Sequence, residues 1–125
     1  MLEIKHVVII GLGAIGMIFA SRIQGCKEVN LLALVDNDRK DRYSRDGIIF
    51  NGKRYDFNYA LPENESNIKA DLIIIATKSS GLKRAIGMIR NYVHDHTIII
   101  PQLNGITSDE MIGDVYGINK VLYSM

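Results

Sequence analysis

Three glycines near the start of the chain have the spacing that binding of two linked phosphates requires. Gly11, Gly13 and Gly16 follow directly on the apolar run 7–10 and lead into a stretch with helical periodicity. In such a pattern the first glycine makes the tight turn out of a strand, the second lets the backbone approach the phosphates, and the third lets the helix pack close to the strand. The anion lies at the helix N-terminus, where unpaired N–H groups and the positive end of the helix dipole attract it. The predicted chemistry is therefore binding of a dinucleotide pyrophosphate.

A carboxylate at the end of the second apolar run supports this interpretation. The run 30–35 ends in Asp36, about twenty residues beyond the last glycine, where the dinucleotide fingerprint places an acid for the adenosine ribose. A glycine triplet alone is a weak signal, because glycines also mark ordinary turns. Its position between a buried strand and a helix makes a bare strand-turn-helix of some other α/β scaffold the less favoured alternative.

The segment after the glycines has the periodicity of a helix. It reaches a natural helix stop at Gly25. Its large apolar residues fall on one face at helical spacing, namely Ile15, Ile18, Phe19 and Ile23. We therefore expect an amphipathic helix with these residues on its apolar side.

Strands and helices alternate along the rest of the chain, with one interruption. The predicted elements are a strand over 30–35, a strand over 71–76, a helix over 81–92, a strand over 97–100, a helix from the capping box at Thr107 and a strand at 121–123. The interruption is a hairpin in which 48–50 and 53–59 flank Asn51-Gly52, a pair that tolerates the positive φ angles of a type I′ turn. The charged stretch 37–42 is expected to form a short helix or a loop that Gly47 closes.

This alternation predicts an α/β fold, namely a Rossmann-like, doubly wound, mostly parallel sheet with helices on both faces. Ligands of such sheets gather outside the carboxyl ends of the strands, near the point where the strand order reverses. Four segments are then expected around one crevice: residues 11–16, 36–39, 77–80 and 102–105.

Composition is consistent with one soluble domain. The 125 residues are expected to form a single domain, residues 1–125, and the 15 basic and 14 acidic residues, net charge +1, argue against nucleic acid or an anionic membrane as a partner. A small molecule or a protein is the expected partner. The one cysteine, Cys26, cannot form an internal disulfide and fits a reducing compartment. The apolar stretch 7–20 is interrupted by glycines and is too short to span a bilayer, so we expect a cytoplasmic location.

A histidine pair near residue 95 is the one candidate for a metal site. His94 and His96 flank Asp95, but His6 is the only other histidine and no cysteine lies near them in the sequence. We interpret the segment as a polar turn between helix and strand and predict no metal.

Taken in order, these segments resemble the N-terminal domain of the ketopantoate reductases over essentially the whole chain. Beyond the glycine fingerprint, the resemblance rests on the strands that run into 76–78 and 103–105, and on Asp46-Gly47 followed by the Asn51-Gly52 hairpin. It implies an NAD(P)-dependent oxidoreductase that transfers hydride to the 2-keto group of 2-dehydropantoate, a step toward pantothenate and coenzyme A. A small-molecule 2-keto acid is then the implied substrate.

The resemblance also implies the residues of the site. In the family, a lysine and an asparagine at the positions of Lys78 and Asn104 lie beside the nicotinamide and the substrate. Hydride arrival at a carbonyl carbon creates alkoxide charge, which a nearby cation or donor stabilises. The alternatives are a surface lysine and an Asn-Gly turn chosen for its backbone. The predicted catalytic residues are Lys78 and Asn104, and the predicted cofactor-binding residues are Gly11, Leu12, Gly13, Ala14, Ile15, Gly16, Asp36, Arg39, Thr77, Lys78 and Asn104.

One departure from the family concerns the choice between NADP and NAD. After the second strand the family often has an arginine or another group that accepts the 2′-phosphate of NADP, whereas this chain has Asp36. A carboxylate repels a phosphate, but Arg39 and Lys40 follow closely enough to neutralise it. The cofactor is therefore expected to be NADP or NAD, with NAD slightly favoured.

A second departure concerns the substrate half of the enzyme. The family's proton-donating lysine and substrate-binding acid lie in a helical C-terminal domain, and this sequence stops at Met125. We therefore expect a cofactor-binding half that turns over poorly alone and that forms a homo-oligomer through apolar surface left exposed. The alternatives are a non-catalytic dinucleotide-binding or regulatory module and the N-terminal domain of another 2-keto or 3-hydroxy acid dehydrogenase.

Overall fold

A five-stranded parallel sheet forms the centre of the molecule. The computed structural model describes residues 4–102 and 106–122. The strands are β1 (His6–Ile10), β2 (Asn30–Leu34), β5 (Asn58–Ala60), β6 (Leu72–Ile75) and β7 (Ile98–Pro101), in the order β5-β2-β1-β6-β7, and each neighbouring pair is parallel. The chain moves outward from β1 in both directions, so the strand order reverses beside β1, as the predicted doubly wound topology requires.

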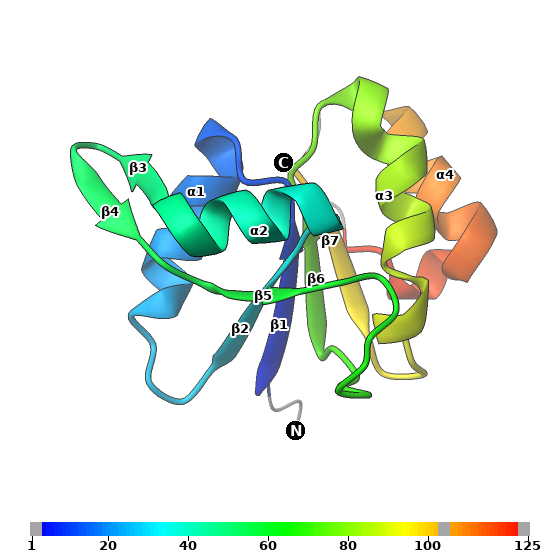
Figure 1. Cartoon of the computed structure of the whole chain (residues 1–125). Coiled ribbons are helices and arrows are strands. Elements are labelled where there is room, and N and C mark those ends of the chain that lie inside the picture. Colours follow the sequence, from blue (N-terminus) through cyan, green and yellow to red (C-terminus); the bar gives the residue numbers. More distant parts are fainter. Residues whose placement is uncertain (1–3, 103–105, 123–125) are drawn as a thin grey trace.

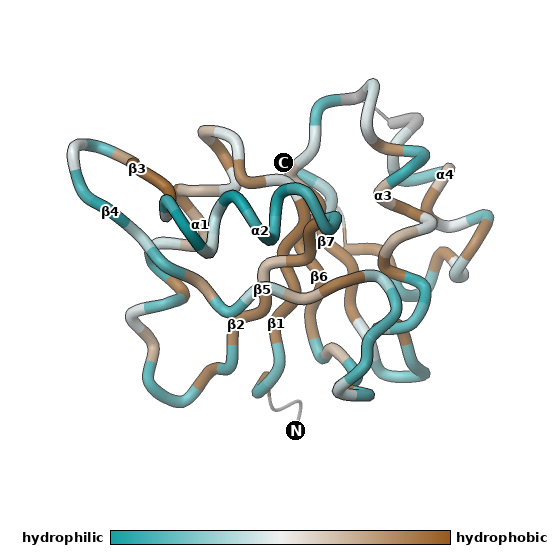
Figure 2. The backbone as a smooth tube through the Cα atoms, viewed as in Figure 1, coloured by the Kyte–Doolittle hydropathy of each residue, from teal (hydrophilic) through white to brown (hydrophobic). Residues whose placement is uncertain are grey.

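Helices cover both faces of this sheet (Figure 1). The α-helices are α1 (Ala14–Gln24), α2 (Asn37–Asp46), α3 (Leu82–Met88) and α4 (Ile106–Tyr116), and three short 3-10 helices are η1 (Ser79–Gly81), η2 (Arg90–Tyr92) and η3 (Ile118–Lys120). One apolar cluster joins alternate residues of β1 to α3 and α4, and a second joins the other residues of β1 to α1. Figure 2 shows the apolar strands at the centre of the molecule and the hydrophilic α2 outside them.

The alternation of side chains along β1 explains why this strand is apolar throughout. Val8 and Ile10 belong to the cluster with α3 and α4, whereas Val7 and Ile9 belong to the cluster with α1, and all four are buried. Successive side chains of a strand point to opposite faces, so a strand covered on both sides is apolar at every position. The predicted fold class, a Rossmann-like parallel sheet with helices on both faces, is confirmed.

The face of α1 that packs against the sheet is only partly the apolar face that the sequence predicted. Ile15 and Ile18 are 51% and 42% exposed, and the buried residues of the helix are Gly16, Met17 and Ala20. Small residues let the helix lie close to the sheet, and they turn the two isoleucines outward. Because α1 is apolar on most of its surface, periodicity alone could not identify the packed side.

The hairpin after α2 is confirmed in its turn but not in its second strand. β3 (Ile48–Phe50) pairs antiparallel with β4 (Lys53–Tyr55) around Asn51 and Gly52, which have φ angles of 51° and 75°. The predicted strand over 53–59 was too long, because residues 58–60 leave the hairpin and pair in parallel with β2. A parallel partner far away in the sequence leaves no local pattern that marks the change.

In the C-terminal half, the predicted helices are present in the structure, but their first and last residues differ from those predicted. The helix expected over 81–92 is α-helical only over α3 and closes with η2, while α4 begins at residue 106, one residue before the predicted capping box. The last predicted strand is reduced to a parallel bridge between Val121 and Ile99, and residue 123 lies outside the described residues. Within the described part of the chain, no helix has the length and apolar character needed to cross a membrane.

Candidate functional site

A cavity of about 410 Å³ opens at the carboxyl ends of the central strands. Its walls come from the loop after β1, the end of β2 with the start of α2, and the segment from β6 into α3. Three of the four segments expected around one crevice therefore meet there. Of the fourth, Gln102 is placed directly after β7, whereas residues 103–105, including Asn104, lie outside the described residues.

The glycine turn has a separate physical reason for each glycine. Gly11 has a φ of +101°, and a Cβ there would lie 2.6 Å from the carbonyl carbon of Ala76 on β6's side of the cavity. A Cβ on Gly16 would lie 1.7 Å from the carbonyl oxygen of Gly11. A Cβ on Gly13 would meet no atom of the described residues within 4 Å. Packing among the described residues thus requires a glycine at positions 11 and 16, but not at position 13.

Gly13 occupies the N-cap of α1 and leaves that helix end open. As a glycine it offers no side-chain hydrogen bond to the first turn, and the first turn carries no acidic residue. An α-helix that starts without a side-chain cap leaves backbone N–H donors for another acceptor. This helix end can therefore receive an anion that approaches the backbone closely.

Asp36 caps the next helix and is held by a guanidinium from the same turn. Its Oδ1 accepts a hydrogen bond from the Arg39 backbone N–H at 2.8 Å, and its Oδ2 accepts one from Arg39 Nη1 at 2.5 Å. The backbone hydrogen bond from Arg39, with the positive charges of Arg39 and Arg84, keeps the pKa of the Asp36 carboxyl below its ordinary value although partial burial opposes the shift. Asp36 is therefore ionised at neutral pH.

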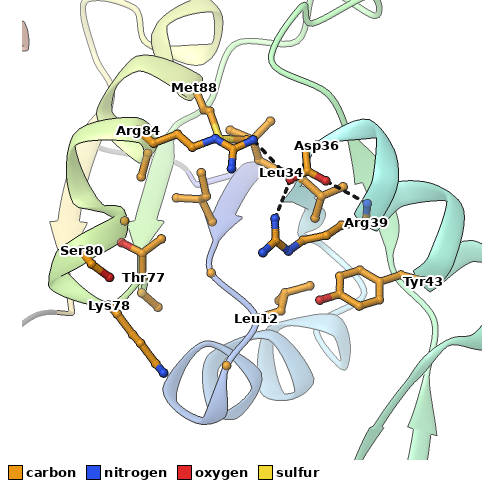
Figure 3. Close-up of a pocket in the computed structure, with 17 residues that line it drawn as sticks. Leu12, Leu34, Asp36, Arg39, Tyr43, Thr77, Lys78, Ser80, Arg84 and Met88 are labelled. Atoms are coloured by element: carbon orange, nitrogen blue, oxygen red, sulfur yellow. Dashed lines mark hydrogen bonds and ion pairs between the residues drawn. The ribbon is translucent and has the colours of Figure 1, made fainter.

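A second guanidinium reaches Asp36 from the opposite wall of the cavity. Arg84 on α3 donates from Nη2 to Asp36 Oδ2 at 3.3 Å, and Figure 3 shows Arg39 and Arg84 converging on this carboxylate. Arg84 was not among the site residues predicted from the sequence. Its place in the helix after β6, outside the apolar stripe, is the signal that could have suggested it. Lys40, named as a neutralising group, instead lines a separate small cavity beside Tyr59.

Thr77 and Lys78 form the wall at the end of β6. Lys78 is exposed and lines the cavity, at the other end from Asp36 in the view of Figure 3. The buried hydroxyl of Thr77 has no hydrogen-bond partner in the described part of the chain. A buried polar atom of this kind next to a cavity suits a polar ligand.

The remaining predicted cofactor residues divide into two groups. Leu12 lines the cavity together with Gly11 and Gly13. Ala14, Ile15 and Gly16 belong to the first turn of α1 and do not line it; Gly16 is buried, whereas the side chains of Ala14 and Ile15 are exposed. Any contact of these three residues with a ligand would therefore come through the backbone of the helix start.

His94 and His96, interpreted as a polar turn, lie between η2 and β7. The two rings pack edge to face with their centroids 5.9 Å apart, and the His96 N–H approaches His94 Nδ1 at 3.4 Å. They lie in the loop on the amino side of β7, whereas the cavity lies at the carboxyl ends of the strands.

A parallel sheet whose first strand ends in a glycine turn and whose second strand ends in a capping acid defines a Rossmann-like, doubly wound domain. The chain belongs to the ketopantoate reductase PanE/ApbA family, which it matches over residues 7–125.

Individual relatives support the same fold. The chain is 24% identical over 116 residues to YkpB of Bacillus subtilis, an uncharacterized oxidoreductase, with 91% of this chain and 38% of YkpB covered. D-mandelate dehydrogenase in its complex with NADH and anilino(oxo)acetate aligns at a TM-score of 0.79, with 21% identity over 96% of this chain and 40% of that one. The 2-dehydropantoate 2-reductase of Geobacter metallireducens aligns at 0.75, with 20% identity over 94% of this chain and 40% of that one. The chain thus spans about two fifths of the length of these relatives.

Proposed function

We propose that this chain binds a nicotinamide dinucleotide in the cavity at the carboxyl ends of β1, β2 and β6. The open N-cap of α1 at Gly13 is the main support for the proposal. None of the described residues lies close enough to require a glycine there, whereas a bound pyrophosphate requires one. Asp36 and its arginines then face the adenosine ribose, and Lys78 lies at the nicotinamide end. Such a ligand has polar and charged groups that this cavity can bind. The cavity offers the open N-terminus of α1, the Thr77 hydroxyl, which has no partner among the described residues, and the charged groups around Asp36.

Titration of the purified chain with NADH and NADPH tests this proposal. The fluorescence of the reduced nicotinamide should change on binding and saturate for at least one of the two, and calorimetry should report one site per chain. Circular dichroism confirms that the sample is folded. A folded chain that binds neither dinucleotide would overturn the proposal.

For the whole protein we propose reduction of a small 2-keto acid, of which 2-dehydropantoate is the first candidate. The bound dinucleotide supplies the hydride. The Lys78 ammonium, exposed at the mouth of the cavity, then stabilises the carboxylate of the substrate and the alkoxide charge that develops at its carbonyl oxygen. The side-chain amide of Asn104 would donate a hydrogen bond to the substrate or to the nicotinamide ribose. Because the chain spans about two fifths of the length of its relatives, we assign the acid that protonates the alkoxide oxygen, and so completes the alcohol, to a helical substrate domain of the whole enzyme.

Substitution of Lys78 in the whole enzyme tests this second step. Lys78→Met keeps the length of the side chain and removes the charge, so kcat for the 2-keto acid should fall by about a hundredfold or more, the usual effect of losing one transition-state donor. The affinity for the reduced dinucleotide should change by less than about threefold. Lys83→Met, an exposed lysine of α3 outside the cavity, is the matched control. Equal kcat values for the two variants would exclude Lys78 from the reaction.

A cytoplasmic location fits this proposal. Cys26 is the one cysteine of the sequence, and its thiol is free and exposed. Free exposed thiols persist in reducing compartments and are oxidised elsewhere. Fractionation of the source cells with an antibody against the chain should find it with the cytosolic proteins, and recovery from a secreted or periplasmic fraction would contradict the proposal.

A further inference from the structure

The charge at the adenosine end of the cavity is positive, although the residue after β2 is an acid. Asp36 contributes one negative charge, and Arg39 and Arg84 each contribute one positive charge within an ion pair to the same Oδ2 atom. Arg39 alone would leave this end neutral. Arg84, which reaches over from α3 and is 48 residues away in the sequence, makes it cationic.

Most of the hydrogen-bonding capacity of the Asp36 carboxylate is already used by the protein. It accepts from the Arg39 backbone N–H, from Arg39 Nη1 and from Arg84 Nη2, which is three donors for about four lone-pair positions. A carboxylate that holds a ribose diol must accept from both hydroxyls. In this structure the acid is instead the anchor of two guanidinium groups.

The two guanidinium groups retain donors that face solvent. The Arg39 and Arg84 side chains are 50% and 66% exposed, whereas that of Asp36 is 24% exposed. Each guanidinium has five N–H donors in a planar fork that matches the oxygens of a phosphate. The longer of the two contacts, at 3.3 Å, is that of Arg84, and it joins two separate elements across the cavity mouth.

We propose that Arg84 is a specificity-determining residue that makes the chain bind the 2′-phosphorylated dinucleotide more tightly than the unphosphorylated one. The proposal rests on the dinucleotide binding proposed above. It reverses the expectation from sequence, in which Asp36 favoured NAD, because that expectation counted the acid without the cation that the fold brings to it from α3. Asp36 holds Arg84 and Arg39 at the ribose position. The guanidinium N–H groups that Asp36 does not use then donate hydrogen bonds to the oxygens of the 2′-phosphate.

Separate titrations with NADPH and NADH test the role of Arg84. The wild-type chain should bind NADPH more tightly. Arg84→Gln should weaken NADPH binding by about tenfold, the effect expected for loss of one charge-assisted contact, and should change NADH binding by less than about twofold. Lys83→Gln removes the same charge from the neighbouring position, outside the cavity, and should change neither affinity.

A second variant separates the role of Arg84 from damage to the cavity. Arg84→Lys keeps a positive charge on α3 and loses the planar fork, so its preference for NADPH over NADH should lie between those of the wild-type chain and Arg84→Gln. Equal losses of both dinucleotides in Arg84→Gln, an unchanged NADPH affinity in that variant, or an NADPH preference in Arg84→Lys no greater than in Arg84→Gln would each overturn the proposal. If the folded wild-type chain bound neither dinucleotide, the failure would lie in the proposed function itself.

Discussion

The α-carbon of Gly16 lies so close to the carbonyl oxygen of Gly11 that a Cβ on residue 16 would be 1.7 Å from that oxygen. No rotation of a side chain relieves this contact, because both partners are backbone. The turn out of β1 and the first turn of α1 are therefore locked together, and the glycine at position 16 sets how the helix start faces the cavity.

Substitution of Gly16 should destabilise the fold. Gly16→Ala requires the β1–α1 turn to open, which makes it an overpacking change of the kind that costs about 1–3 kcal/mol. The free energy of unfolding, measured by urea denaturation, should fall by that amount. Dinucleotide affinity should fall with it, since the helix start is displaced. Unchanged stability would show that the turn adapts at no cost.

Substitution of Gly13 should affect binding and spare the fold. In the part of the chain that the structure describes, a Cβ at residue 13 meets no atom within 4 Å, and the residue has an ordinary φ of −76°. Gly13→Ala should therefore change the free energy of unfolding by less than about 1 kcal/mol. Its methyl group would stand where the phosphates approach, so the Kd for the preferred dinucleotide should rise by about tenfold or more. An unchanged Kd would contradict binding at this helix end.

Substitutions at two glycines, Gly52 and Gly87, should distinguish the effect of backbone strain from the effect of packing. Among residues 4–102 and 106–122, no atom would lie within 4 Å of a Cβ on Gly52 or Gly87, but Gly52 has a φ of +75° in the hairpin turn. Gly52→Ala should lower the free energy of unfolding by about 1–2 kcal/mol, because an L-residue is strained there. Gly87→Ala, in α3, should raise it by about 0.5–1 kcal/mol. Thermal unfolding of the two variants should shift in opposite directions, and shifts of the same sign would be inconsistent with this explanation.

Asp71 should stabilise the sheet at the end opposite the cavity. Its Oδ2 accepts the backbone N–H groups of Lys5 and His6, both at 2.9 Å, at the start of β1. Asp71→Ala should cost about 2 kcal/mol at neutral pH, as hydrogen bonds to a charged group do. Dinucleotide affinity should stay unchanged because the cavity lies at the other ends of the strands.

The contribution of Asp71 should disappear in acid. Desolvation opposes the charged form, but the amides of His6 and Lys5 outweigh it and hold the pKa of the Asp71 carboxyl below its ordinary value of 3.8. A lowered pKa in the folded state gives stability that is complete above 3.8 and is lost as pH falls through the folded-state value. The difference in unfolding free energy between wild type and Asp71→Ala should shrink below about pH 4. A difference that stays constant to pH 2 would mean that the charge plays no part.

Much of the site could be predicted because its parts are local in sequence. The turn at Gly11 needs a positive φ, the Asp36 cap uses a donor three residues away, and the Asn51-Gly52 turn needs no distant partner. Each depends on backbone preferences of a few consecutive residues. Asn104, on which part of the proposed chemistry depends, lies outside the described residues, so its role stays a prediction.

The sequence by itself determined the β–α–β unit, the glycine turn and the acid at the end of β2, because periodicity and turn chemistry act between near neighbours. Only the tertiary structure decided that residues 58–60 extend the sheet, that α1 packs through its small residues, and that Arg84 reaches Asp36. These features depend on contacts between distant segments, such as the 48 residues between Asp36 and Arg84, whose energies exist only once the sheet and its helices have assembled. The sign of the charge at the Asp36 end of the cavity is therefore a property of the fold.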